Sequence, residues 1–119
     1  MNSQEKQMAF NALKNVFDSS PKPYDKNISL NIYSKYLVNN NDISEEQFEI
    51  WKKYLFDVLD ILFSNLGLNS FMETNIKITQ LIQQFNQNNR FNQNKITYMQ
   101  LVFQIKDELI KLMQTVVHY

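Results

Sequence analysis

The stretch SEEQFEIWKKYLFDVLDILFSNLG, residues 44–67, decides the fold class, because its whole length has helical periodicity. It opens with Ser44 three residues before Gln47, which is the spacing of a capping box. It ends at Gly67, the only glycine of the chain and a residue type that favours the left-handed turn after a helix. We therefore predict one long helix between these two signals.

Apolar side chains cover far more than one face of this predicted helix. One arc, opposite a narrow polar stripe, is expected to face the core: Phe48, Trp51, Leu55, Val58, Leu59, Leu62 and Leu66. Both flanks of the arc are apolar as well: Ile50, Tyr54 and Ile61 on one side, Phe56 and Phe63 on the other. A helix with so wide an apolar arc is either central to a bundle or buried against a second chain.

Two further helices are predicted before this one. Residues 3–18 repeat an apolar stripe and are preceded by Asn2, which forms a possible capping box with Glu5. Prolines at positions 21 and 23 end this segment. Residues 29–38 fit a strand through alternating apolar residues and also fit a helix. We favour the helix, because the sequence offers no partner strand.

Two more helices are predicted after Gly67. Ser70 and Glu73 have capping-box spacing and open a one-sided helix to about residue 86. Residues 95–117 form the last helix, and its wide apolar arc includes Phe103 and Ile110. Lys106 falls inside that arc, where we expect its stem to cover apolar surface while the amine reaches water. The Asn-rich stretches 39–42 and 87–94 are expected to be loops.

The predicted fold class is therefore all-α: a compact bundle of four to five helices forming a single domain over residues 1–119. A chain of 119 residues is long enough to bury a core of its own. We expect about two-thirds helix or more, against a globular average near one-third. Trp51, in the middle of the core arc, is expected to be buried.

Composition argues against most catalytic and ligand-binding sites. One glycine cannot build a phosphate-binding loop, and a chain without cysteine has neither disulfides nor thiolate metal sites. The only histidine, His118, is next to the last residue. Asp57 and Asp60 lie one turn apart, but a solvated helix face explains them better than a metal site. We therefore expect no enzyme activity, no cofactor and no bound metal.

Charge and hydropathy restrict location and partners. The formal net charge is +0 and no basic stripe is visible, so we expect no nucleic-acid partner. The first residues lack the apolar core of a secretory signal, and no run is long enough to span a membrane. These features favour a cytoplasmic protein without a membrane partner.

The excess apolar surface is the remaining functional signal. We expect a non-enzymatic protein–protein interaction module, a small adaptor, inhibitor or assembly subunit such as phages and mobile elements encode. Its partner would be another protein or a second copy in a twofold homodimer. The expected interface residues come from the flanks of the two widest arcs: Ile50, Tyr54, Phe56, Ile61, Phe63, Phe103 and Ile110. The alternative is a binder of a small apolar or amphipathic ligand in a bundle cavity lined by aromatic and methionine side chains.

Overall fold

The structure, a computed structural model, describes residues 1–23 and 42–119 and contains four helices in that part of the chain. They are α1 (Ser3–Asp18), α3 (Glu45–Leu66), α4 (Asn69–Arg90) and α5 (Tyr98–His118). Within the described residues 80% are helical and none forms a strand. The predictions of an all-α fold and of high helical content are confirmed for this part. The helix predicted over residues 29–38 lies outside the described residues.

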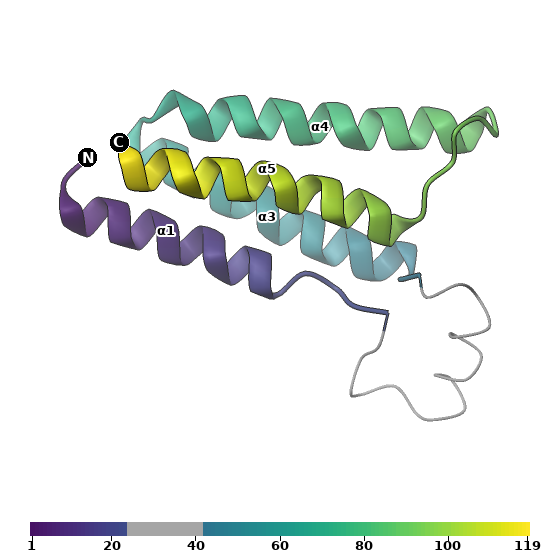
Figure 1. The fold of residues 1–119 in the computed structure, drawn as a ribbon, viewed down its shortest axis with the longest axis horizontal. Helices are drawn as coiled ribbons and strands as arrows, with labels where there is room; N and C mark the ends of the chain where they lie inside the picture. The colour runs from purple at the N-terminus through teal and green to yellow at the C-terminus, as the bar shows by residue number, and fades with distance from the viewer. Residues whose placement is uncertain (24–41) are drawn as a thin grey trace.

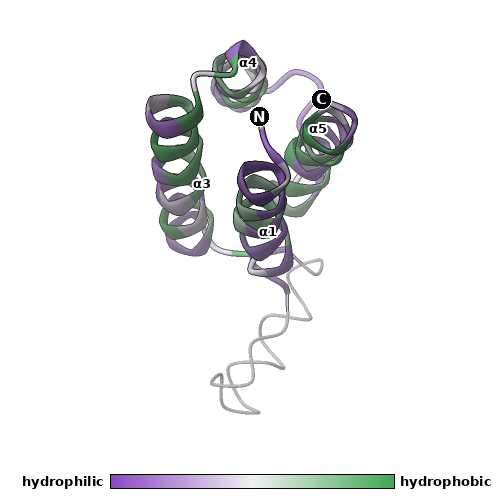
Figure 2. Ribbon diagram, turned by 90° about the vertical axis from the view of Figure 1, so that its left-hand side faces the viewer, coloured by the Kyte–Doolittle hydropathy of each residue, from purple (hydrophilic) through white to green (hydrophobic). Residues whose placement is uncertain are grey.

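The four helices run alternately in opposite directions and form a bundle (Figure 1). Seen from the end, α3 and α5 lie on opposite sides, with α1 and α4 between them (Figure 2). Both α3 and α5 contact α1 and α4 and also touch each other, whereas α1 and α4 are not in contact. The two helices with the widest apolar arcs thus have the most helical neighbours, which explains part of their width.

Three helices begin with complete capping boxes, in which two orphan amides are satisfied reciprocally. Asn2 with Glu5 caps α1 and Ser44 with Gln47 caps α3, so both predicted boxes are confirmed. Thr97 with Gln100 caps α5 in the same way, at distances of 2.8 and 3.1 Å. The last helix is therefore confirmed, but its predicted start near residue 95 is three residues too early. Thr97 has the extended backbone of an N-cap, and the helix begins at Tyr98.

The turn between α3 and α4 is shorter than expected. Gly67 adopts the left-handed conformation, with φ of 68°, and its amide donates to the carbonyl of Phe63 at 2.8 Å. Leu68 then serves as the N-cap of α4 without a side-chain hydrogen bond, and it is buried in the core. The capping box predicted for Ser70 and Glu73 is wrong, because Ser70 already lies inside the helix.

The end of α4 also differs from the prediction. The helix continues to Arg90, so the first half of the Asn-rich stretch 87–94 is helical. The side-chain amide of Gln84 donates to the side-chain oxygen of Asn88, one turn further on, at 2.9 Å, and this bond supports the last turns of the helix. The turn begins only afterwards, with positive φ at Asn92 and Asn94. Asparagine tolerates that conformation better than other non-glycine residues.

Asp42, which lies just before α3, contacts the start of α5. Its carboxylate accepts hydrogen bonds from the amides of Tyr98 and Met99, at 3.2 and 3.0 Å, across more than fifty residues of sequence. The same carboxylate accepts from its neighbour Ile43 at 2.8 Å. Since the first amides of a helix have no internal partner, Asp42 and Thr97 together satisfy the start of α5.

Trp51 lies in the core between α3 and α1, and 4% of its surface is exposed, so its predicted burial is confirmed. Its indole N–H donates to the carbonyl of Val16 at 2.9 Å. Buried tryptophans need such a partner for their one polar atom. Most of the predicted core arc of α3 is buried, although Val58 and Leu66 remain half-exposed.

The phenol ring of Tyr98 packs between two phenylalanines at the start of α5. Ring centroids lie 5.4 Å apart for Phe48 and 4.8 Å apart for Phe85. Burial raises the pKa of Tyr98 above its ordinary value of 10.0, and nearby carboxylates, first that of Glu45, raise it further. Both effects penalise the charged phenolate.

We therefore expect Tyr98 to titrate above pH 10.0 in the folded protein. The native state binds this proton more tightly than the unfolded chain does. The contribution of the protonated phenol to the free energy of unfolding is therefore lost as pH rises through the folded-state pKa. Isotope-labelled tyrosine, followed by NMR across an alkaline titration, measures this pKa, and the Tyr98→Phe variant identifies the resonance. A midpoint at or below the ordinary value would contradict the prediction.

Candidate interaction surfaces

The structure divides the seven predicted interface residues into two groups. Five are exposed: Ile50 (66%), Ile61 (58%), Phe103 (57%), Tyr54 (42%) and Ile110 (38%). The other two, Phe56 and Phe63, are half-buried and pack against the core. Phe63 lies beside α4, where it shares a surface hollow with Phe71 and Met72. The bundle thus leaves open the flank of α3 that carries the two isoleucines.

We call that flank the α3 stripe: Ile50, Tyr54, Asp57 and Ile61. Their spacing of four, three and four residues places all four side chains on one line along the helix. The line lies on the opposite flank of α3 from Phe63, so it points away from α4 and into solvent. Within the described residues, neither the Tyr54 hydroxyl nor the Asp57 carboxylate makes a hydrogen bond or an ion pair. The stripe therefore combines exposed apolar surface with one free donor and one free acceptor.

A second surface is a groove between α1 and α5, which we call the α1–α5 groove. Its main hollow has a volume of about 420 Å³, and its apolar walls come from both helices: Phe10, Phe17, Ile110, Met113 and Val117. A second hollow of about 310 Å³ continues it toward the start of α1 and shares Phe10 and Val117. The remaining residues along the two hollows are polar: Ser3, Lys6, Gln7, Lys14, Asp18, Gln114 and His118.

The sequence predicted only the α5 side of this groove, through Ile110. Phe10 was missed, because it lies beside the core stripe that Ala9, Leu13 and Val16 form on α1. The signal was nevertheless present. Phe10 and Phe17 are seven residues apart, so they share one face of the helix and form a second line of large apolar side chains.

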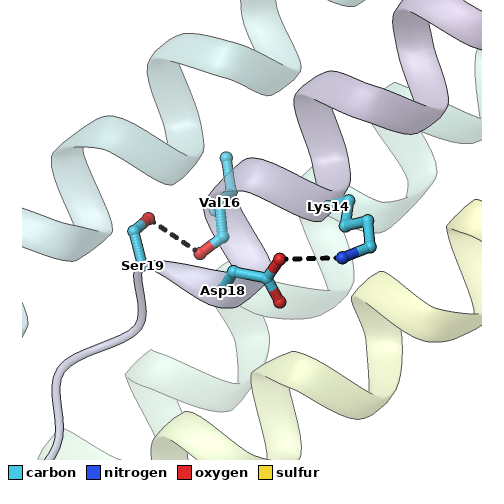
Figure 3. A network of polar contacts seen from close by, with 4 residues as sticks. All are labelled: Lys14, Val16, Asp18 and Ser19. Carbon is cyan, nitrogen blue, oxygen red and sulfur yellow. Dashed lines mark hydrogen bonds and ion pairs between the residues drawn. The ribbon is translucent and has the colours of Figure 1, made fainter.

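The two lysines that line the groove differ in their surroundings. Lys14 donates to the carboxylate of Asp18 at 3.0 Å at the end of α1, where the Ser19 hydroxyl also donates to the Val16 carbonyl at 3.1 Å (Figure 3). Lys6 has no carboxylate partner among the described residues. The groove is therefore electrically balanced at the end of α1 and positive near its start.

The ammonium of Lys106 packs on the ring of Phe17, which forms part of the groove wall. This ammonium lies 4.2 Å from the centre of the Phe17 ring and 3.1 Å from the hydroxyl of Ser20. Burial lowers the pKa of Lys106, and the positive charge of Lys22 lowers it further. Lys106 is half-buried, and the sequence did not predict either partner of its amine. A ring face and a buried hydroxyl are available to it only because α1 ends beside α5.

Other kinds of site were sought in the part of the chain that the structure describes. No three histidine or carboxylate side chains there gather closely enough to hold a metal ion, and Asp57 and Asp60 form no such cluster. None of the helices described is long and apolar enough to cross a membrane. No protein-family model, curated protein or solved structure matches the chain.

Proposed function

We propose that the protein is a non-enzymatic interaction module that forms a homodimer through the α3 stripe. The observation that carries the proposal is the exposure of Ile50 and Ile61 on a helix that already has a complete core face. Large aliphatic side chains lined up on an outer helix face are typical of a helix–helix interface. Phe103 and Ile110 are exposed too, but they lie on α5, on the opposite side of the bundle from α3, so this dimer does not use them.

The order of residues in the stripe suits a second copy of the same helix. When two copies meet antiparallel about a twofold axis, residues equally distant from the midpoint of the stripe face each other. Ile50 then packs against Ile61 of the second copy, and Tyr54 faces Asp57 of the second copy. The free hydroxyl donates to the free carboxylate, and symmetry makes each of these contacts twice.

A single pair of helices is a small interface, so we expect a dissociation constant in the micromolar range. Light scattering across a dilution series measures it. Ile61→Asp should abolish the dimer and keep the fold, because the side chain is exposed in the monomer and would become an unpaired buried charge in the dimer. Tyr54→Phe should weaken the dimer at least about tenfold by removing two hydrogen bonds to a charged group.

Ile76→Asp is the matched control, because Ile76 is 51% exposed and lies on α4, away from the stripe. It should leave the dimer intact. Phe56→Asp should instead destabilise the monomer, since that ring packs against the core. A wild-type protein that stays monomeric at high micromolar concentration would refute the proposed function.

A further inference from the structure

We propose that the α1–α5 groove binds a long-chain carboxylate, with the acyl chain along the apolar walls and the carboxylate beside Lys6. This site is separate from the α3 stripe, and the inference does not depend on the proposed homodimer. The two hollows together touch α5 from Ile110 to His118 and α1 along its whole length, from Ser3 to Asp18. That length of helix measures about 24 Å, so the groove suits an extended ligand better than a compact ring.

The lining of the groove determines the chemistry of the chain. Phe10 and Phe17 supply rings from α1, while Met113 and Val117 supply aliphatic surface from α5. Val117 is 50% exposed although it lies between the two hollows, so a bound chain would remove its surface from water. Volumes of about 420 and 310 Å³ both lie within the usual range for small-molecule sites, which begins at about 300 Å³.

The charges along the groove determine where the head group lies. Asp18 is the one carboxylate among the lining residues, and it is already paired with Lys14. Lys6, in the second hollow, has no such partner among the described residues. An anionic head group at Lys6 therefore neutralises the uncompensated end, and an acyl chain running from there reaches the rings of Phe10 and Phe17.

Calorimetric titration of the full chain with saturated carboxylates of increasing length, kept below micelle-forming concentrations, tests the proposal. Octanoate, decanoate and dodecanoate should bind at one site per chain, with affinity rising about twofold to fourfold per added methylene. Dodecanol supplies the same chain without the charge. It should bind more weakly than dodecanoate, and raised salt should reduce that difference.

Two variants locate the site. Val117→Asp should abolish binding of both dodecanoate and dodecanol, because it places a negative charge in the apolar channel. Lys6→Gln should weaken dodecanoate about fivefold while leaving dodecanol unchanged. Lys77→Gln, on the exposed face of α4, is the matched control and should change neither. Circular dichroism confirms that each variant is folded.

Three results would overturn the inference: no saturable binding of dodecanoate, affinity independent of chain length, or equal effects of Lys6→Gln and Lys77→Gln. Ile61→Asp should bind dodecanoate like the wild type. Loss of the dimer and loss of the ligand site are therefore separate outcomes.

Discussion

Replacing Trp51 by alanine should lower the free energy of unfolding by about 3–5 kcal/mol, the largest single-site effect that we expect. The indole fills the contact between α3 and α1, and only 4% of its surface is exposed. Removing it leaves a cavity that rigid neighbouring helices can close only in part. Urea denaturation followed by circular dichroism measures the change without relying on the lost fluorophore.

Trp51→Phe separates the two roles of this side chain. Phenylalanine keeps much of the buried surface and loses the hydrogen bond to the Val16 carbonyl. We expect a loss of about 1–2 kcal/mol, because that carbonyl also accepts from the Ser19 hydroxyl and is not left without a partner. Phe91→Ala is the matched control: its ring is 65% exposed, and the change should stay within about 0.5 kcal/mol.

Dimerisation would stabilise the folded state in a concentration-dependent way. The Trp51 variants are therefore best compared in the Ile61→Asp background, where the monomer alone is measured. Native fluorescence supplies an independent check, since a buried indole emits at short wavelength. A red-shifted, fully quenched emission, or a loss below about 1 kcal/mol for Trp51→Ala, would contradict the packing described for α3.

The second large effect is expected at Asp42, whose replacement by alanine should cost about 2 kcal/mol. The variant leaves the amides of Tyr98 and Met99 without their acceptor at the start of α5. It also removes a negative charge from the positive end of the helix dipole. Asp42→Asn retains one acceptor oxygen and should lose about half as much.

Hydrogen exchange identifies the cause of this loss. The amides of Tyr98 and Met99 should exchange slowly in the wild type and much faster in Asp42→Ala. Amides in the middle of α4 should keep the same ranking of exchange rates in both proteins. Thr97→Ala removes only the local cap, so it should expose the amide of Gln100 instead. Equal stability of the alanine variant and the wild type would show that water replaces the carboxylate at no cost.

Local signals in the sequence were sufficient to predict two helices almost to the residue. The first helix and the long central one each begin with a capping box whose two members are three residues apart. Gly67 ended the central helix because it adopts a positive φ without a steric penalty. Apolar periodicity correctly predicted that Trp51 lies in the core, because this periodicity, like a cap, depends only on the geometry of one helix.

Local signals failed where another part of the chain supplied the decisive contact. Leu68, packed in the core, starts α4 in place of the predicted Ser70 box. The Lys106 ammonium contacts the Ser20 hydroxyl and the ring of Phe17, two partners beside the neighbouring helix α1 that the sequence did not predict.

Sequence by itself determined that the described part of the chain is helical, where two of its helices begin and end, and that α3 and α5 carry more apolar surface than one face can bury. Only the tertiary structure decided how that surface is used. It turned Phe56 and Phe63 toward the core, left Ile50 and Ile61 open, and brought Phe10 beside Val117. The physical reason is that a helix's own periodicity defines its faces, whereas the burial of each face depends on which neighbouring helix packs against it.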